Sequence, residues 1–523
     1  MTEPLLSEPL SSDTRTWTVG DLLDHAAARW PDRTAIVDGD RRHSYAELRH
    51  QARQFGSSLI GLGVRPGDRV AIWMPNSAEW VISFFGAVYA GAVVVPLNTA
   101  LSSREVEYQV SQSGARTLIS ATSYRNRDYR AESEQIAAAM RRELDLVCVG
   151  QPDQIPGILS WEELTSGGER HELPALDVSD PVIMLYTSGT TGLPKGAVHS
   201  HRFVAMQFAG AARLGITEAD CLVLYLPLFH IMALVAGLLM MTAAGARVVL
   251  MPRFNAAESL RLMEAERATA IYGIPTTYLD QLADPAIETT DLSSVRFALT
   301  PLAYDLCLRV RDTFGVVCLN PYGMTETAAL VTVAELDEPA EIALATVGRP
   351  IEGMEARIVD PDSGRELPPG KQGLLAMRGP SILLRYHEMP DATSAVFDEE
   401  GWFNTGDVAS LDEAGNITFV GRQGDSYRVG GEIVDPIEVE AAIQSHPDVI
   451  RAAAVGVPDE RLGQVGHVWV QTRSGSAVSA DDLRAHARTV LASFKVPRAV
   501  HLLDEFPTNA SGKVQKFKLL QSV

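Results

Sequence analysis

The sequence predicts an α/β protein with a large N-terminal domain of layered α/β subdomains and a β-rich subdomain, followed by a small α+β C-terminal domain. At 523 residues the chain is too long for one hydrophobic core. Strand-like and helical patterns alternate over most of its length, which is typical of parallel sheets covered by helices. Proline- and glycine-rich turns at residues 361–364 and 368–370 then separate shorter β segments.

The first 180 residues contain clear helix starts. Thr18 is placed to cap a helix that runs to Arg29, and Ser44 with Glu47 matches a capping box at the start of a helix to about Leu62. Strand-like runs follow at residues 69–74 and 92–96, on either side of an apolar helix that begins near residue 78. This order predicts a sheet with parallel strands.

The same alternation recurs in the middle of the chain. Residues 231–246 are almost wholly apolar, but the run is short for a membrane span and predicts a buried helix. Short apolar runs predict four more strands at residues 222–225, 248–251, 270–272 and 295–299.

The last hundred residues read as a small α+β unit. We expect a helix at 436–445, strands at 452–457 and 467–472, and a helix from Ser479 to about Leu491. Residues 423–523 hold 11 Lys and Arg against 12 Asp and Glu, so nearly all of the net charge of −21 lies before them. A nearly neutral lobe suits an approach to phosphate groups.

Composition argues against several binding partners and bears on the cellular compartment. The strong negative charge argues against nucleic acid or an anionic membrane as a partner, since both require a basic face. The four cysteines show no metal spacing, lie among apolar neighbours and predict buried free thiols in a reducing compartment. No signal-peptide core is visible at the N-terminus. We therefore expect a cytoplasmic protein with no membrane span.

The most informative segment is residues 186–196, YTSGTTGLPKG, directly after an apolar strand at 182–186. Four hydroxyl side chains, three glycines and Lys195 together suit a polyphosphate, because hydroxyls and free backbone N–H groups donate hydrogen bonds. The segment is not a P-loop, since Pro194 stands in place of a glycine and no Ser or Thr follows Lys195. The alternative is a polar surface loop.

Three further motifs follow in order: YGMTET at 322–327, WFNTGD at 402–407 and PTNASGKV at 507–514. Together with the glycine-rich loop they resemble the signatures of the AMP-forming adenylating superfamily, which includes acyl- and aryl-CoA synthetases, peptide-synthetase adenylation domains and beetle luciferase. The resemblance extends from about residue 17 to about residue 518. Alone, each later motif would be an ordinary helix start, turn or basic tail.

The resemblance implies a site for ATP and Mg²⁺. It assigns the adenine stack to Tyr322, the α-phosphate to Thr325 and the metal to Glu326, in keeping with the preference of Mg²⁺ for carboxylate and phosphate oxygens. Asp407 and Arg422 would contact the ribose. The residues expected to hold the departing phosphates are Thr187, Ser188, Gly189, Thr190, Thr191, Gly192 and Lys195.

The resemblance also implies a mobile C-terminal lid. Lys513 would stabilise the negative charge that develops as the acid attacks ATP, and would withdraw when the lid rotates. A second face with Gly430 and Gly431 would then admit the pantetheine arm of coenzyme A. These expectations set an N-terminal domain at 1–421, a hinge at 422–425 and a lid domain at 426–523.

The chain departs from the family pattern at three places. The hinge pivot, usually Lys or Asp, is Gly424, and Ile433 stands where the family usually carries Asn on the thiol-transfer face. Pro301 and Leu302 replace glycines in a loop along the acid pocket, which predicts an altered or narrowed pocket. A glycine pivot permits rotation while specifying the two end positions less strictly.

The predicted acid pocket is uncharged. His230, at the end of LPLFH, either contacts the substrate carboxylate or is a satisfied core residue. The absence of a charged residue favours an apolar or aromatic acid over an amino acid. The remaining residues expected to line the pocket are Met232, Ala233, Tyr272, Ile274, Ala298 and Ala328.

The sequence therefore predicts an ATP-, Mg²⁺- and CoA-dependent ligase that forms an acyl-adenylate from a small-molecule carboxylic acid, apolar or aromatic, and passes the acyl group to CoA. Alternatives left open are transfer to a carrier-protein thiol or another nucleophile, and activation of a non-carboxylate oxyanion. A non-catalytic nucleotide sensor is a further alternative, which the retention of every signature residue disfavours. A homodimer is also left open.

Overall fold

The computed structural model describes most of the chain. The described residues are 14–140, 143–150, 156–187, 194–300, 304–361, 363–422, 427–429, 432–434, 436–459, 462–491, 493–508 and 514–520. By contacts the chain forms two compact units. The first unit holds residues 1–355 and 377–403, and the second holds 356–376 and 404–523.

An eight-stranded sheet forms one half of the first unit. Its five central and outer strands, from β4 to β7, run parallel, as predicted, and β8 is parallel to β4. At the other edge β9 is antiparallel to β8, and β20 is antiparallel to β9. The order is β20 (Arg385–Tyr386), β9 (Lys195–Ser200), β8 (Pro181–Thr187), β4 (Val93–Pro96), β3 (Arg69–Trp73), β5 (Ala115–Ala121), β6 (Asp145–Val149) and β7 (Ile158–Ser160).

A seven-stranded sheet forms the other half, and it recruits strands from the start of the chain. β1 pairs in parallel with β11, although the sequence patterns did not predict that the N-terminal segment joins strands 200 residues away. The Tyr45 hydroxyl fixes this crossover by donating to the Ala246 carbonyl at 2.6 Å. The order is β14 (Val317–Leu319), β13 (Phe297–Leu299), β12 (Ala270–Tyr272), β10 (Cys221–Leu224), β11 (Arg247–Leu250), β1 (Thr34–Asp38) and β2 (Arg41–Ser44).

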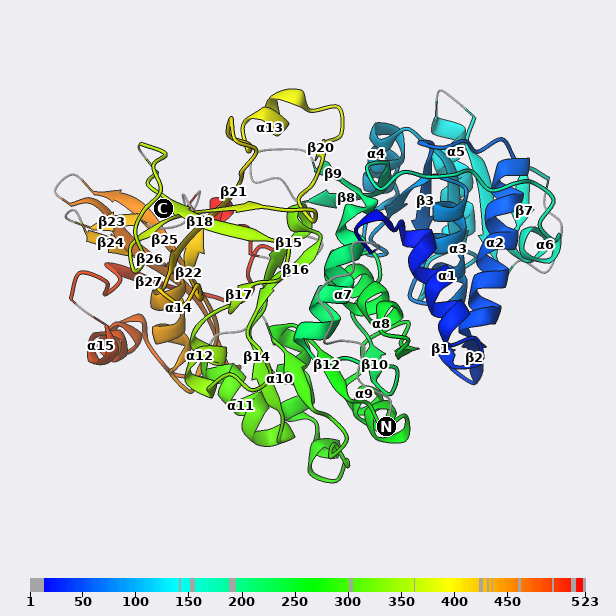
Figure 1. The fold of residues 1–523 in the computed structure, drawn as a ribbon. Coiled ribbons are helices and arrows are strands. Elements are labelled where there is room, and N and C mark those ends of the chain that lie inside the picture. Colours follow the sequence, from blue (N-terminus) through cyan, green and yellow to red (C-terminus); the bar gives the residue numbers. More distant parts are fainter. Residues whose placement is uncertain are drawn as a thin grey trace. The chain divides into compact units, whose positions relative to one another are not determined.

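Helices α1 (Val19–Arg29), α2 (Tyr45–Gly61) and α3 (Ala78–Tyr89) lie side by side on the first unit (Figure 1). Both predicted helix starts are confirmed, because Thr18 with Asp21 and Ser44 with Glu47 form reciprocal capping boxes. Glycines let α2 and α3 pack closely: a Cβ on Gly86 would lie 2.7 Å from a Phe55 ring carbon.

Further helices cover the two sheets of the first unit. They are α4 (Ser103–Ser113), α5 (Tyr129–Ala139), α6 (Trp161–Ser166), α7 (Val204–Arg213), α9 (Ala256–Ala265), α10 (Pro275–Ala283), α11 (Tyr304–Phe314), α12 (Ala340–Ala345) and α13 (Pro390–Ser394).

The apolar run at 231–246 is a buried helix, as predicted. It begins as a π-helix, η4 (Met232–Leu239), and continues as α8 (Met240–Ala243). Wide π turns are rare and occur often beside functional sites. Among the described residues, no helix is both long and apolar enough to cross a bilayer. All four cysteines are buried free thiols, which confirms their predicted state.

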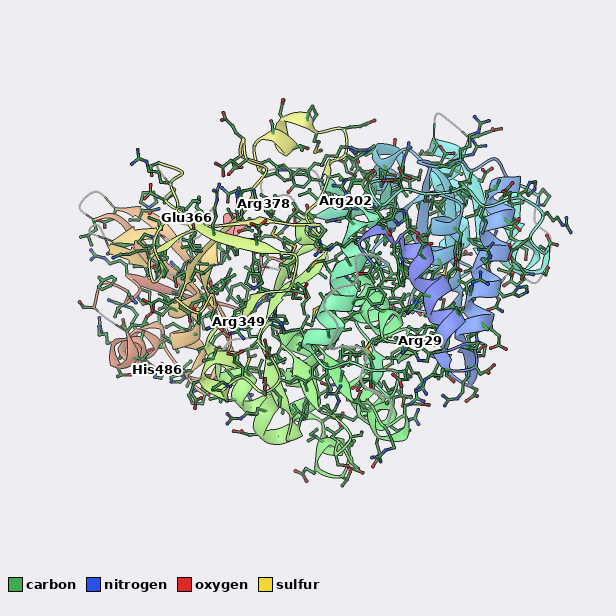
Figure 2. The ribbon with its side chains drawn as sticks, viewed as in Figure 1. Arg29, Arg202, Arg349, Glu366, Arg378 and His486 are labelled. Atoms are coloured by element: carbon green, nitrogen blue, oxygen red, sulfur yellow. The ribbon has the colours of Figure 1, made fainter. Side chains whose placement is uncertain are left out.

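Two smaller sheets follow. One contains β15 (Tyr322–Met324), β16 (Ala329–Val333) and β17 (Arg349–Pro350), and the other β18 (Glu355–Val359), β19 (Gln372–Arg378), β21 (Phe403–Leu411) and β22 (Ile417–Arg422). The pairs β15–β16, β16–β17 and β21–β22 are antiparallel. Arg378, labelled in Figure 2, ends β19. Its guanidinium bonds Glu355 at 2.9 Å and lies 4.5 Å from the Trp402 ring centroid.

The end of the second unit is the predicted small α+β fold. Tyr427 is central to its core, and two glycines make room for it: a Cβ on Gly456 would lie 2.2 Å from the Tyr427 Cβ, and one on Gly466 2.1 Å from its hydroxyl. The elements are β23 (Tyr427–Val429), β24 (Glu432–Val434), α14 (Pro436–Gln444), β25 (Val449–Asp459), β26 (Gly463–Thr472), α15 (Ala480–Val490), β27 (Ala499–Leu503) and α16 (Lys516–Leu520).

The contact units differ from the domain boundaries expected from the sequence. Residues 356–376 and 404–421, expected in the N-terminal domain, group by contacts with the C-terminal segment. The functional boundary at 421 and the hinge at 422–425 stay predictions, and residues 423–426, with Gly424, lie outside the described residues.

Candidate active site

The two stems of the predicted phosphate loop are adjacent strands. Thr187 ends β8, Lys195 begins β9, and the two residues are direct partners in the antiparallel ladder. This register places Lys195 at the mouth of the loop, as the motif predicts. The predicted phosphate-binding residues Ser188, Gly189, Thr190, Thr191 and Gly192 lie outside the described residues.

Helix α4 supports both stems from residues that the sequence did not single out. The Tyr186 hydroxyl donates to the Gln109 carbonyl at 3.1 Å, and the Tyr108 hydroxyl donates to the Pro194 carbonyl at 3.3 Å. Gln112 donates to the His387 carbonyl at 3.1 Å, which ties β20 to the same helix. The loop therefore begins and ends on backbone that is fixed by one helix.

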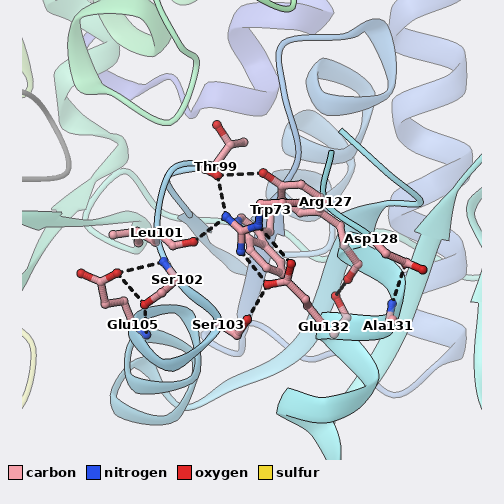
Figure 3. Close-up of polar contacts among 12 residues, drawn as sticks. Trp73, Thr99, Leu101, Ser102, Ser103, Glu105, Arg127, Asp128, Ala131 and Glu132 are labelled. Atoms are coloured by element: carbon pink, nitrogen blue, oxygen red, sulfur yellow. Dashed lines mark hydrogen bonds and ion pairs between the residues drawn. The ribbon is translucent and has the colours of Figure 1, made fainter. Parts of the chain in front are cut away.

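An arginine network in turn fixes the start of α4 (Figure 3). Arg127 donates to the Thr99 and Leu101 carbonyls at 3.1 and 2.7 Å, and pairs with Glu132, which also accepts from Ser103. Its guanidinium lies 5.2 Å from the Trp73 ring centroid, a cation–π distance. This network anchors the segment that leads into α4, and no motif announces it.

The YGMTET motif is a strained turn. Thr325 to Thr327 form one 3₁₀ turn, and the next two residues, Ala328 and Ala329, have φ values of 51° and 73°. Such left-handed backbone is unfavourable for residues other than glycine and is found where the surrounding structure enforces it, often at functional sites. At Gly323 a Cβ would lie 1.5 Å from the Ala329 carbonyl oxygen, so only glycine fits there.

Glu326 is a buried carboxylate, 7% exposed, held by two separate contacts. The Tyr386 hydroxyl donates to Glu326 Oε1 at 2.9 Å, and the backbone carbonyl of Glu326 accepts from the Leu383 amide at 2.8 Å. On the same tyrosine, the Lys195 Nζ lies 5.2 Å from the ring centroid. The structure thus brings together the predicted phosphate lysine and the predicted metal ligand, on a tyrosine that sequence reasoning missed.

His199 connects β9 to the same turn. Its Nε2 lies 2.8 Å from the Thr325 carbonyl, and because a carbonyl only accepts, Nε2 carries the proton. Burial lowers the pKa of His199 to about 4, so the ring is neutral at pH 7. The sequence showed this residue only as part of the loop signature. The available signal was its position four residues after Lys195, because residues four apart on a strand lie on the same face.

The two residues predicted to contact the ribose lie in the second unit. Asp407 on β21 and Arg422 on β22 are direct partners in an antiparallel ladder, and their role at the ribose stays a prediction. Asp407 is 4% exposed, and its backbone amide donates to the Thr405 hydroxyl at 3.1 Å. Gly406, with φ of 73°, provides the backbone turn before it.

The loop before His230 is held by a buried asparagine. Asn76 donates to the Leu226 carbonyl at 2.9 Å and accepts from the Leu228 amide at 2.8 Å. His230 itself is exposed, which excludes the core alternative, and its ring lies 4.7 Å from that of Phe229. Desolvation by the protein around it lowers the pKa of His230.

Several predicted residues remain without structural description. Lys513, Gly430, Gly431, Pro301 and Leu302 all lie outside the described residues. Of the six apolar residues expected to line the acid pocket, Met232 and Ile274 are solvent-accessible and the other four are buried. These assignments stay predictions.

Tyr322 is 8% exposed on β15, and Thr325 is partly exposed beside Glu326. Among the described residues, no group of three or more His, Cys, Asp or Glu side chains could hold a metal by itself. This agrees with Mg²⁺ chemistry, in which one or two carboxylates act together with phosphate oxygens and water. The buried Glu326 carboxylate is a metal ligand of the required kind.

Comparisons with known proteins agree over the whole chain. The AMP-binding enzyme family model matches residues 23–387, and the AMP-binding enzyme C-terminal domain model matches residues 438–513. A methyl-dioxo-octahydroindenyl-propanoyl:CoA ligase of Mycobacterium tuberculosis is 36% identical over 516 residues, which cover 96% of this chain and 98% of that ligase.

Two solved structures are also similar. An anthranilate CoA ligase in complex with anthranoyl-AMP matches with a TM-score of 0.87 and 29% identity, over 98% of this chain and 99% of that chain. The o-succinylbenzoate CoA synthetase of Bacillus subtilis, in complex with ATP and magnesium, matches with a TM-score of 0.81 and 29% identity, over 95% of this chain and 98% of that chain.

Proposed function

The chain belongs to the AMP-binding enzyme family, and we propose that it activates an apolar or aromatic carboxylic acid with ATP and transfers the acyl group to CoA. The relatives described above are CoA ligases and match this chain over most of its length, which supports AMP-forming CoA ligase activity with ATP, Mg²⁺ and CoA. The proposal adds the class of acid and the roles of individual residues.

One observation carries the residue assignment. Lys195 and Glu326, which are 131 positions apart, both contact Tyr386. A cation suited to phosphate oxygens and a carboxylate suited to Mg²⁺ therefore lie on one aromatic side chain, next to the stems of the glycine-rich loop. A polar surface loop would not explain this juxtaposition of opposite charges.

In the first step, a carboxylate oxygen of the acid attacks the α-phosphorus of ATP, and the bond from that phosphorus to the bridging oxygen of pyrophosphate breaks. Lys195 binds the departing phosphates, and Thr325 donates to the α-phosphate. Glu326 would hold the magnesium ion, which would supply positive charge to offset that of the phosphates. Lys513 stabilises the charge that develops between the two anions, which would otherwise repel each other.

In the second step, the CoA thiolate attacks the acyl carbonyl of the adenylate, and AMP leaves. Asp407 and Arg422 hold the ribose through both steps, since an ionised carboxylate accepts from hydroxyl groups. The backbone at Gly430 and Gly431 gives the pantetheine arm close access. Rotation about residues 422–425 exchanges the face that carries Lys513 for this one.

The class of acid is inferred from the surroundings of His230. This ring is accessible and its pKa is lowered by burial, which favours a neutral donor to a carboxylate over an ion pair. Two of the residues expected to line the pocket, Met232 and Ile274, are apolar and accessible. The relatives named above act on a fused-ring propanoyl acid and on anthranilate, which are carboxylic acids with apolar or aromatic bodies.

The proposal is tested by measuring AMP release with ATP, Mg²⁺ and CoA, across aromatic, fused-ring, medium-chain and amino acids. We expect turnover with apolar or aromatic acids and none with amino acids. A parallel reaction with a phosphopantetheinylated carrier protein in place of CoA distinguishes the two thiol acceptors. Preference for an amino acid, or for the carrier protein over CoA, would contradict the proposal.

A further inference from the structure

We propose that Tyr386 is a positioning residue for the magnesium–nucleotide complex, which places the Glu326 carboxylate with its hydroxyl and the Lys195 ammonium with its ring. This inference rests on the proposed function, because it concerns how the same site receives Mg²⁺ and phosphate. No sequence motif marks Tyr386, which lies 60 positions after Glu326.

The hydroxyl contact orients the metal ligand. The bond from the Tyr386 hydroxyl to Glu326 Oε1 is 2.9 Å long and buried, and it is charge-assisted because its acceptor is a carboxylate. A carboxylate that accepts one such bond keeps further lone pairs for a metal. Hydrogen-bond partners behind a metal ligand fix its rotamer, and their loss typically weakens metal binding by about 10- to 100-fold.

The ring contact serves the lysine. With its Nζ 5.2 Å from the Tyr386 ring centroid, the Lys195 ammonium is within cation–π range. A lysine side chain has many rotamers, and a resting place near the loop lowers the entropy that is lost when the phosphates bind. The lysine therefore contacts the ring of Tyr386, while the glutamate contacts its hydroxyl.

The backbone of Tyr386 is itself fixed on two sides. Strand β20 pairs with β9, where Tyr386 is the partner of Ala197 and the His387 amide donates to the Gly196 carbonyl at 2.8 Å. Just before the strand, the Leu383 amide donates to the Glu326 carbonyl at 2.8 Å. Tyr386 therefore cannot move away from the lysine strand or from the glutamate turn without breaking backbone bonds.

The matched control is a second tyrosine with the same kind of bond. Tyr89 is 6% exposed, as is Tyr386, and its hydroxyl donates to Asp24 Oδ1 at 2.8 Å. It lies on α3 at its contact with α1, in a region with no predicted site residue. Tyr89→Phe removes a partly buried tyrosine–carboxylate bond and a longer bond to the Gly20 carbonyl at 3.3 Å, and it changes no predicted residue of the magnesium site.

The experiment measures binding of α,β-methylene-ATP, which resists cleavage at the α-phosphate, by isothermal titration calorimetry with Mg²⁺ or with EDTA. We expect Tyr386→Phe to reduce the Mg²⁺-dependent gain in affinity by about ten-fold and to leave the affinity in EDTA unchanged. Tyr386→Leu should also weaken binding in EDTA, because Lys195 loses the ring. Tyr89→Phe should match the wild type in both buffers.

Equal loss in Mg²⁺ and in EDTA for Tyr386→Phe would overturn the proposal, as would no loss in either buffer. Melting temperatures of the two Phe variants separate a general loss of stability from a local effect. A double variant with Glu326→Gln gives a second measure, since Tyr386→Phe should add nothing once the carboxylate is absent. Because these assays need no turnover, they stay informative if the enzyme rejects every acid in the activity panel.

Discussion

The predicted phosphate residues, here called the phosphate half, and the predicted ribose residues, the ribose half, lie in different units and are positioned by different means. In the first unit, Lys195, Glu326 and Tyr386 come from segments far apart in the sequence and meet through side-chain contacts. In the second unit, Asp407 and Arg422 are 15 positions apart and are brought together by the register of one antiparallel ladder. The phosphate half therefore depends on tertiary packing, whereas the ribose half depends on local strand pairing.

The largest effect should come from the group that neither half supplies. Lys513→Ala should lower the rate of acyl-adenylate formation about 1000-fold, because it removes a cation that acts in the transition state. Transfer to CoA from a chemically prepared acyl-adenylate should largely survive. Single-turnover measurements of each step check this, and an equal fall in both would contradict the rotation of the lid.

The phosphate half should also show a pH dependence that arises from His199 and its packing. The folded-state pKa of His199 is about 4, below the usual value of 6.5, so the unfolded chain binds more protons between these values. Its contribution to the free energy of unfolding, about 3 kcal/mol, is therefore present above pH 6.5 and is lost as the pH falls to 4.

His199→Gln, which keeps a donor for the Thr325 carbonyl, should flatten this dependence. Denaturant unfolding of the wild type and the variant at pH 4.5, 5.5 and 7 provides the comparison. His201, also buried and with a pKa of about 4, accepts from the Val19 amide and remains as an internal control. An unchanged slope in the variant would show that His199 is not the titrating group.

The ribose half should respond more simply. Asp407→Asn keeps the shape of the side chain and removes the charge that strengthens its bonds to the ribose hydroxyls, so KM for ATP should rise by about 10- to 100-fold. Since the ladder between β21 and β22 is formed by backbone, the melting temperature should change little. Steady-state kinetics and thermal melting together test this. A large loss of stability would show that Asp407 supports the fold and does not act only in ATP binding.

The smallest effect should come from Asn76, which supports the loop of His230 from behind. Asn76→Ala should raise KM for the acid by about five-fold and leave KM for ATP unchanged, because two backbone contacts of the acid-side loop are lost. Kinetics with each substrate varied in turn separate the two constants. An equal rise in both would show that this loop also shapes the nucleotide site.

The same contrast explains what the sequence could and could not predict. The helix starts at Thr18 and Ser44 and the strands follow from local patterns, and the structure confirms them. The register that pairs Asp407 with Arg422 comes from the structure alone. The recruitment of β1 into the sheet of β11 could not be foreseen, because strand partners distant in sequence leave no local signal. Tyr386 and Arg127 were not predicted because their partners are also distant in the sequence.

The sequence motifs predicted the roles of individual residues but not the neighbouring residues and backbone that hold them in place. YGMTET identified Glu326 through resemblance, yet the strained backbone at Ala328 and Ala329 and the need for glycine at position 323 emerge only from the fold. His230 was ambiguous in the sequence, and its exposure settles that it is not a core residue. A lone histidine before an apolar helix carries too little information to decide this.

Adenylation of a carboxylic acid at the proposed Lys195–Glu326 site is tested most directly by acid-dependent exchange of labelled pyrophosphate into ATP in the absence of CoA, with the wild type and Lys195→Ala. We expect exchange with an apolar or aromatic acid in the wild type and its loss in the variant. Exchange that is absent with every acid, or that is undiminished without Lys195, would contradict it.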